Sequence, residues 1–296
     1  FPDGNAEPAG DDEFMVKTAQ KMYHEISPET GEFIDFMIDH ELMDLQNKPG
    51  KASTGYMTSL PSLKAPFVFS CFNHTIFDMQ VLTHELGHAF AGYMAMRSQP
   101  ISDYYSESTD IAEIHSMSME QFAYPYAEWF FGDQADKFRF AHLQEALTFV
   151  PFGVAVDEFQ HICYAHPELT PKERTYQWHL LEEKYMPWRK YDNDAFMERG
   201  GYWYHKLHIY LYPFYYINYT LTTMGAMEFK KKYAEDKAAA WQDYLNLCKV
   251  GGSRGYLETL RYANLSDPFE AGSVERACGY AEEILLAQMA AQEQKA

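Results

Sequence analysis

The chain has 296 residues, 47% of them hydrophobic and 23% charged, which suits a globular protein with a substantial core in one large domain or two small ones. Its net charge of −19 argues against a nucleic-acid surface, and no apolar run reaches the ~20 residues of a membrane span, so we expect neither nucleic acid nor a membrane as a partner. The four scattered cysteines include no C-x-x-C pair and favour reduced thiols in a cytoplasmic protein.

The N-terminal part of the chain predicts two helices followed by short strands. A capping aspartate begins the first helix, and a serine followed by proline begins the second. The later runs are rich in aromatic and β-branched residues and are bounded by turn residues. The predicted elements are a loop over 1–10, helices over 11–26 and 27–43, a break over 47–51, and strands over 55–58 and 66–72.

From about residue 76 the pattern stays helical to the end of the chain. Glycine pairs and an Asp-Pro step interrupt it, and one later helix begins with a capping box. The expected features are helices over about 76–96 and 106–131, a capping box at 170–173, breaks at 200–201, 251–252 and 267–268, and a last helix over about 273–292.

The most informative motif is His84-Glu85-Leu86-Gly87-His88 in the first of these helices. Residues four apart lie on one helix face, so both imidazoles can point at one zinc ion. Glu85 would then stand beside the ion, placed to act on a metal-bound water. The alternative is a buried helix whose two histidines hydrogen-bond to their neighbours.

The next long helix carries the candidates for a third ligand. A catalytic zinc site takes three protein ligands and keeps one position open. Asp110, Glu113 and Glu120 share one helix face among apolar residues, although such an acidic stripe is more often a solvated surface. Residue chemistry leaves the third ligand open between Glu113, Asp110 and His115. Glu120 is suited to orient a ligand histidine.

An aromatic run over residues 200–219 is the third unusual feature. If it is helical, one face carries four hydrogen-bond donors: His208, Tyr212, Tyr215 and Tyr219. Donors aimed at the oxyanion of a tetrahedral intermediate lower the barrier to amide hydrolysis. Pro213 can bend or begin a helix here. The alternative is an aromatic packing stripe whose hydroxyls reach solvent.

Together these segments resemble the M3 family of zinc metallopeptidases, which contains thimet oligopeptidase and oligoendopeptidase F, and the match is closer to the latter. Order and spacing agree from about residue 40 to residue 220. The resemblance is carried by His84–His88, by Ala112-Glu113-Ile114 with Glu120, by Gly50-Lys51 and Gly55-Tyr56, and by His208-Ile209-Tyr210, Pro213-Phe214-Tyr215 and Tyr219. The chain departs from the family at Ala91, where another histidine is common, and at Leu211-Tyr212. Family members also carry a large N-terminal helical region, and we expect most of it to be missing from this chain.

The resemblance implies a role for each matching residue. It implies that His84, His88 and Glu113 bind one zinc ion per chain and that Glu85 is the general base. His208, Tyr215 and Tyr219 are expected to contact substrate and stabilise the transition state. Glu120 and Asp110 are expected behind the ligands, and Gly55, Tyr56 and Tyr212 beside the substrate.

The expected protein is a mainly α-helical, zincin-like catalytic domain over residues 1–296, with a small β-sheet beside the metal helix. We expect it to be the C-terminal portion of a longer peptidase that hydrolyses short peptides. Its expected partners are those peptides and either its own N-terminal region or a second copy. Two alternatives are a non-catalytic peptide-binding fragment with a structural or vestigial zinc, and a zinc hydrolase of another substrate class.

Overall fold

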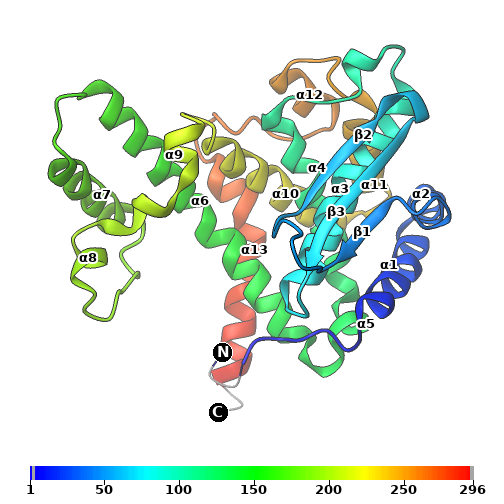
Figure 1. The fold of residues 1–296 in the computed structure, drawn as a ribbon, viewed down its shortest axis with the longest axis horizontal. Coiled ribbons are helices and arrows are strands. Elements are labelled where there is room, and N and C mark those ends of the chain that lie inside the picture. The colour runs from blue at the N-terminus through cyan, green and yellow to red at the C-terminus, as the bar shows by residue number, and fades with distance from the viewer. Residues whose placement is uncertain (2–3, 294–296) are drawn as a thin grey trace.

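The computed structural model describes residues 1 and 4–293 and is mainly α-helical with one small sheet, which confirms the predicted fold class. Figure 1 shows a body built around α3 (Phe77–Ser98), α4 (Thr109–Ala123) and α10 (Ile217–Glu235), and an arm that extends from it. The other helices are α1 (Asp12–Ile26), α2 (Pro28–Asp39), α5 (Ala127–Phe131), α6 (Ala135–Ala165), α7 (Pro171–Tyr185), α8 (Ala195–Glu198), α9 (Leu207–Leu211), α11 (Lys237–Val250), α12 (Tyr256–Tyr262) and α13 (Ser273–Glu293).

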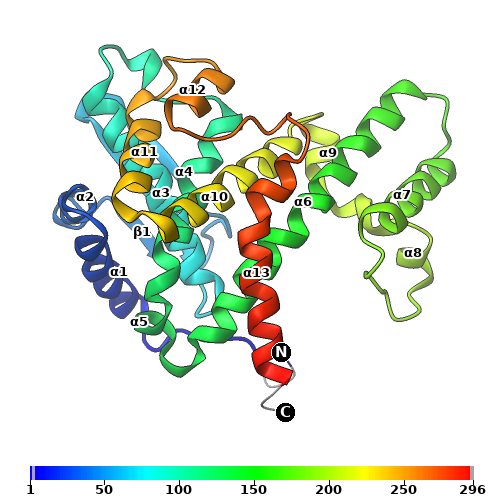
Figure 2. The same cartoon turned by 180° about the vertical axis from the view of Figure 1, so that it is seen from behind.

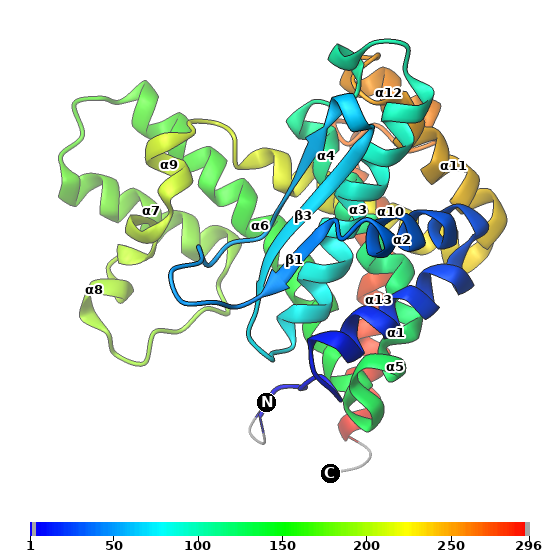
Figure 3. The same ribbon diagram turned by 45° about the vertical axis from the view of Figure 1, so that its right-hand side comes forward.

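The sheet lies against α3, and its three strands are seen best in Figure 3. They are β1 (Met43–Gln46), β2 (Tyr56–Leu60) and β3 (Ala65–Phe72), in the order β1-β3-β2. The central strand β3 pairs parallel with β1 and antiparallel with β2. Most of its residues are buried, whereas residues of β2 alternate between exposed and half-buried. β2 is therefore an edge strand on the exposed side of the sheet.

The arm has a hydrophobic core of its own. The 31-residue helix α6 leads from the body into the arm, where α7 packs against it and α8 lies further out (Figure 1). The indole of Trp178 is fully buried there between Phe152 and Phe159. In the body, α13 runs beside α6 and α10, as the view from behind shows (Figure 2). Among the described helices, none is both long and apolar enough to cross a membrane.

The predicted helix caps are present. The Asp11 carboxylate accepts a hydrogen bond from the Phe14 amide at the start of α1, and the Ser27 hydroxyl accepts one from the Thr30 amide at the start of α2. Thr170 and Glu173 form the capping box of α7. These features depend on a few neighbouring residues only, which is why the sequence alone predicts them.

Two helix predictions were wrong in their extent. The second helix ends at Asp39 rather than near Met43, because Glu41 takes a positive φ of 52° and the next residues pair with β3 as strand β1. The predicted helix over 106–131 begins at Thr109 and is broken after Ala123, since Pro125 lies in a 3₁₀ turn and has no amide hydrogen to donate.

Gly87 sets the distance between the two helices that carry the metal motif and the acidic face. A Cβ atom at this position would lie 2.7 Å from Ser116 Cα and 2.9 Å from Met119 Cβ. Real Cβ atoms do not approach backbone so closely, so only glycine lets α3 lie this near to α4. The motif glycine therefore has a packing reason independent of chemistry.

Substituting Gly87→Ala is expected to destabilise the protein by about 1–3 kcal/mol, because the added methyl group must push α4 away. The measurement is the free energy of unfolding in urea. Gly279→Ala on α13 is the matched control: nothing lies within 4 Å of its added Cβ, and it should be neutral or stabilising by up to about 1 kcal/mol. Equal stability of the Gly87 variant and the wild type would contradict this packing account.

Candidate active site

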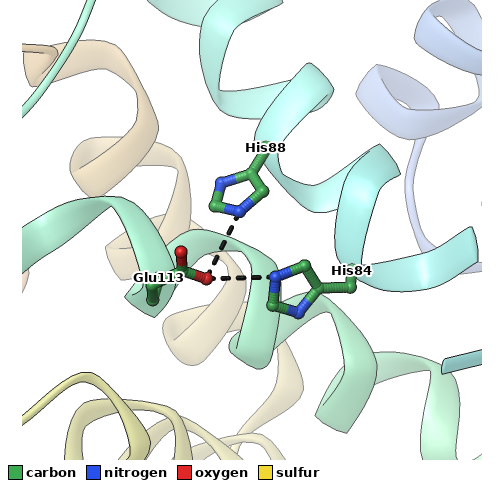
Figure 4. Close-up of side chains that lie close together, drawn as sticks. All are labelled: His84, His88 and Glu113. Carbon is green, nitrogen blue, oxygen red and sulfur yellow. Dashed lines mark ion pairs between the residues drawn. The ribbon is translucent and has the colours of Figure 1, made fainter. Parts of the chain in front are cut away.

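Three side chains from α3 and α4 meet at one point in the body. His84 and His88 lie one turn apart on α3, and Glu113 faces them from α4 (Figure 4). Glu113 Oε2 is 3.0 Å from His84 Nε2 and 3.3 Å from His88 Nε2. Within the described part of the chain, this is the group of histidine, cysteine and acidic side chains whose ligand atoms all lie within 4.8 Å of one another.

The donor set and its spacing fit a zinc ion. Two imidazole nitrogens and one carboxylate oxygen are a usual protein ligand set for catalytic zinc. Ligand atoms at about 2.05 Å from a tetrahedral ion would be roughly 3.3 Å apart. The contacts of Glu113 Oε2 with His84 and His88, at 3.0 and 3.3 Å, are close to this separation. Both separations therefore suit ligands of one tetrahedral ion, and the three ligand atoms all lie within 4.8 Å of one another.

The other candidates for a third ligand point elsewhere. His115 is buried and faces away from the cluster, with Nδ1 3.1 Å from Glu107 Oε1 and Nε2 near the carbonyl of Leu247. Asp110, at the start of α4, accepts a hydrogen bond from the Ser108 hydroxyl. Of the three residues that chemistry left open, Glu113 is the one that the structure brings to the two histidines.

A second carboxylate supports the histidines from behind. His84 Nδ1 donates to Glu120 Oε1 at 2.6 Å, which leaves Nε2 directed at Glu113. The other oxygen of Glu120 accepts a 2.6 Å hydrogen bond from His142 Nε2 on α6. Sequence reasoning missed His142, because it lies 22 residues after Glu120 on a helix beyond a break in the pattern. No local spacing indicates this contact.

The pKa values of the acidic groups follow from burial and from these histidines. Burial alone would raise the pKa of Glu113, but the hydrogen bonds from His84 and His88 outweigh it and hold that pKa well below its ordinary value. The pKa of Glu120 is also lowered, since hydrogen bonds from His142 and His84 exceed the opposing effect of its burial. Both groups are therefore carboxylates at neutral pH.

Glu85 is the exception among these acids. It is buried beside the cluster, and burial raises its pKa. Its Oε2 atom is buried without a hydrogen-bond partner among the described groups. A carboxylate with a raised pKa and a free oxygen can take up a proton from a neighbouring molecule more readily than an ordinary glutamate.

A cleft of about 480 Å³ opens between β2 and the cluster. Its lining includes Gly55, Tyr56, Met57 and Ser59 of the β2 region, His84, Glu85 and His88 of α3, Glu113 and Met117 of α4, and Tyr219 of α10. Gly55 has a specific role here, because a Cβ atom at this position would lie 2.9 Å from Glu85 Oε1. Tyr56 is about half exposed, and its ring stacks on Phe69 at 4.9 Å.

The aromatic run is not the continuous helix that its residue spacing suggested. Helix α9 ends at Leu211, the chain turns with Phe214 at a positive φ of 60°, and α10 begins at Ile217. The turn nevertheless gathers the predicted side chains. The ring of His208 lies 5.8–6.2 Å from the rings of three tyrosines: Tyr212, Tyr215 and Tyr219.

Of the four predicted donors, Tyr219 is the one that lines the cleft beside the metal cluster. It lines the cleft and also a second, mostly apolar cavity of about 280 Å³, which it shares with His84 and Met117. His208 and Tyr216 line this second cavity, whereas Tyr212 is largely exposed. Tyr216 was not predicted, because the helical spacing assumed for the run placed it on another face.

A helix with H-E-x-x-H opposed by a glutamate from a following helix is typical of metallopeptidases. The sequence profile of Peptidase family M3 matches residues 16–279, and the chain belongs to this family, as the resemblance predicted. Oligoendopeptidase F homolog of Borreliella burgdorferi is 25% identical over 234 residues, which are 76% of this chain and 38% of that protein. Oligopeptidase PepF of Bacillus subtilis is 23% identical over 257 residues, which are 84% of this chain and 37% of that protein.

The fold agrees with the same family. A structure of PZ peptidase A with an inhibitor matches this chain with a TM-score of 0.89 and 49% sequence identity. The match covers 97% of this chain and 51% of that one. The chain therefore spans 37–38% of the curated relatives and about half of the solved structure.

Substituting Gly55→Ala is expected to displace the Glu85 carboxylate while leaving the three clustered side chains in place. A misplacement of about 1 Å can lower a catalytic rate by roughly 10²-fold, so peptide hydrolysis should fall steeply at unchanged zinc affinity. Gly92→Ala is the control, since Gly92 lines the same cleft but its added Cβ would meet its neighbours only at 3.4 Å or more. If the Gly55 and Gly92 variants hydrolyse peptides equally fast, Gly55 does not position Glu85.

Proposed function

We propose that this chain is the catalytic part of a zinc-dependent endopeptidase that hydrolyses short peptides. The observation that carries the proposal is the convergence of His84, His88 and Glu113 on one point, with Glu85 in the same cleft. Membership of Peptidase family M3 supports peptide hydrolysis as the reaction. The restriction to short peptides comes from the relatives, whose names describe oligopeptidases.

His84, His88 and Glu113 would hold one zinc ion per chain. When bound, zinc supplies a Lewis acid for the attack of water on an amide carbonyl. Glu113 would add a negative charge to the two imidazoles, whose Nε2 atoms now face its Oε2 and would give up any proton there to bind a cation. Glu120 holds the proton of His84 on Nδ1, so that Nε2 offers its lone pair to the ion.

Glu85 would move the proton. Its raised pKa and its free Oε2 suit a general base that accepts a proton from the attacking water. The same group then delivers that proton to the leaving amine. Because Gly55 has no Cβ, the Glu85 carboxylate has room to lie at the wall of the cleft, where an added Cβ would come within 2.9 Å of its Oε1.

The substrate would lie between β2 and the aromatic cluster. β2 is an edge strand, and its residues line the cleft, so an extended peptide could pair with it through main-chain hydrogen bonds. On the opposite side, Tyr219 and His208 offer donors for the developing oxyanion. Burial raises the pKa of Tyr219, which keeps its hydroxyl protonated and able to donate. Roles for Tyr212, Tyr215 and Asp110, cytoplasmic localisation and the expected protein partners stay predictions.

Replacing Glu85 by glutamine tests the mechanism. Glu85→Gln should keep zinc at one ion per chain, because Glu85 is not among the clustered ligands, and should lower kcat by about 10²–10⁴-fold. The measurements are metal analysis and cleavage of a quenched fluorescent peptide with and without a chelator. Glu183→Gln on the exposed face of α7 is the control and should behave as the wild type.

Other outcomes of this experiment would replace the proposal. Wild-type turnover by a zinc-loaded Glu85→Gln chain would show that Glu85 is not the base. Zinc-loaded wild type that binds peptides without cleaving them would identify a peptide-binding fragment. Cleavage of a non-peptide ester or amide, with none of peptides, would identify a hydrolase of another class.

A further inference from the structure

Among the described residues, His142 is the buried histidine outside the metal cluster whose contacts lead directly into it. Its Nε2 lies 2.6 Å from Glu120 Oε2, and Glu120 Oε1 lies 2.6 Å from His84 Nδ1. The side chains of His142 and Glu120 are almost completely buried. A continuous chain of hydrogen bonds therefore joins α6, through α4, to the first histidine of the motif on α3.

The hydrogen-bond partners of the imidazole nitrogens determine which nitrogen of His84 and of His142 carries a proton. His84 can offer Nε2 to a cation only if its proton is on Nδ1, and there Glu120 accepts it. His142 donates from Nε2, and its Nδ1 is buried without a partner among the described groups. A proton on that Nδ1 would be buried and unsatisfied, so the geometry favours the tautomer of His142 that carries its proton on Nε2.

Glu120 needs two donors to stay in one orientation. A carboxylate held only by His84 could rotate about its side-chain bonds and turn the imidazole with it. His142 prevents this rotation, because its ring is itself held by packing. It stacks on Phe138 with centroids 5.4 Å apart and planes at 10°, and lies 6.3 Å from the ring of Tyr124.

We propose that His142 is a positioning residue: through Glu120 it fixes the ring plane and the proton position of His84 for metal binding. The inference deepens the proposed function and rests on it, since it takes His84 as a zinc ligand. It predicts that the donor at position 142, rather than the ring, determines zinc affinity. Groups hydrogen-bonded to a metal ligand, as Glu120 is to His84, typically contribute 10–100-fold to metal affinity.

Two substitutions separate the donor from the ring. His142→Phe keeps an aromatic ring against Phe138 but removes the hydrogen-bond donor to Glu120. His142→Gln keeps an N–H donor but removes the ring stacking. The readouts are the zinc dissociation constant, from competition with a chromophoric chelator, and the thermal unfolding midpoint of the zinc-free chain. His161→Phe on the exposed face of α6 is the control, with 68% of its side chain exposed.

The expected order of zinc affinity is distinctive. His142→Phe should bind zinc about 10–100-fold more weakly than the wild type, whereas His142→Gln and His161→Phe should stay within a few-fold. A purely structural role would make zinc affinity follow the unfolding midpoint, with the glutamine variant the weaker one. Either that order or equal affinity of all variants would overturn the proposal.

Failure of this inference can be told from failure of the proposed function. Wild-type chain that binds zinc but cleaves no peptide would overturn the peptidase and leave the order of zinc affinities as a valid test of His142. Wild-type chain that binds no zinc would overturn both.

Discussion

The close approach of α3 to α4 at Gly87 is the constraint on which the rest of the site depends. The motif places two imidazoles on one face of α3, but a helix face alone cannot surround an ion. The third side chain must come from a neighbouring element. Glu113 Oε2 lies 3.0 Å from His84 Nε2 because Gly87, about one turn further along α3, has no side chain that would keep the two helix backbones apart. Packing and ligand geometry are thus two consequences of the same glycine.

The close packing of α3 and α4 also buries negative charge, and the histidines stabilise that charge. Burying an unpaired carboxylate costs several kcal/mol, and α4 brings two carboxylates into the core. Glu113 and Glu120 each accept hydrogen bonds from two histidines, and their pKa values are lowered despite their burial. Glu85 Oε2 accepts no hydrogen bond from the described residues, and burial raises the pKa of Glu85. Three glutamates within one small region therefore have different proton affinities, as the proposed ligand, support and base roles would require.

The sequence predicted the parts of this arrangement that depend on neighbours along the chain. Helix caps, the i, i+4 histidines and the shared face of Glu113 and Glu120 are local, and they are present in the structure. The choice between Glu113, Asp110 and His115 needed the resemblance to a family, because all three stand on one helix and only tertiary packing decides which faces α3.

What the sequence could not predict depends on long-range packing. The second helix was extended to Met43, the first residue of strand β1, because the pairing of β1 with β3 overrides the local apolar spacing. The aromatic run was given one helical face, whereas a turn at Phe214 brings His208 against Tyr215 and Tyr219. His142 carries no local signal, since the Glu120 carboxylate that it supports belongs to another helix.

In the proposed peptidase, His84, His88 and Glu113 together hold one zinc ion. Diffraction from crystals of the zinc-loaded chain, measured on both sides of the zinc absorption edge, locates that ion. We expect one anomalous peak per chain, about 2.0–2.2 Å from His84 Nε2, His88 Nε2 and an oxygen of Glu113. A peak held by other side chains, or a fully loaded site that Glu113 does not contact, would contradict it.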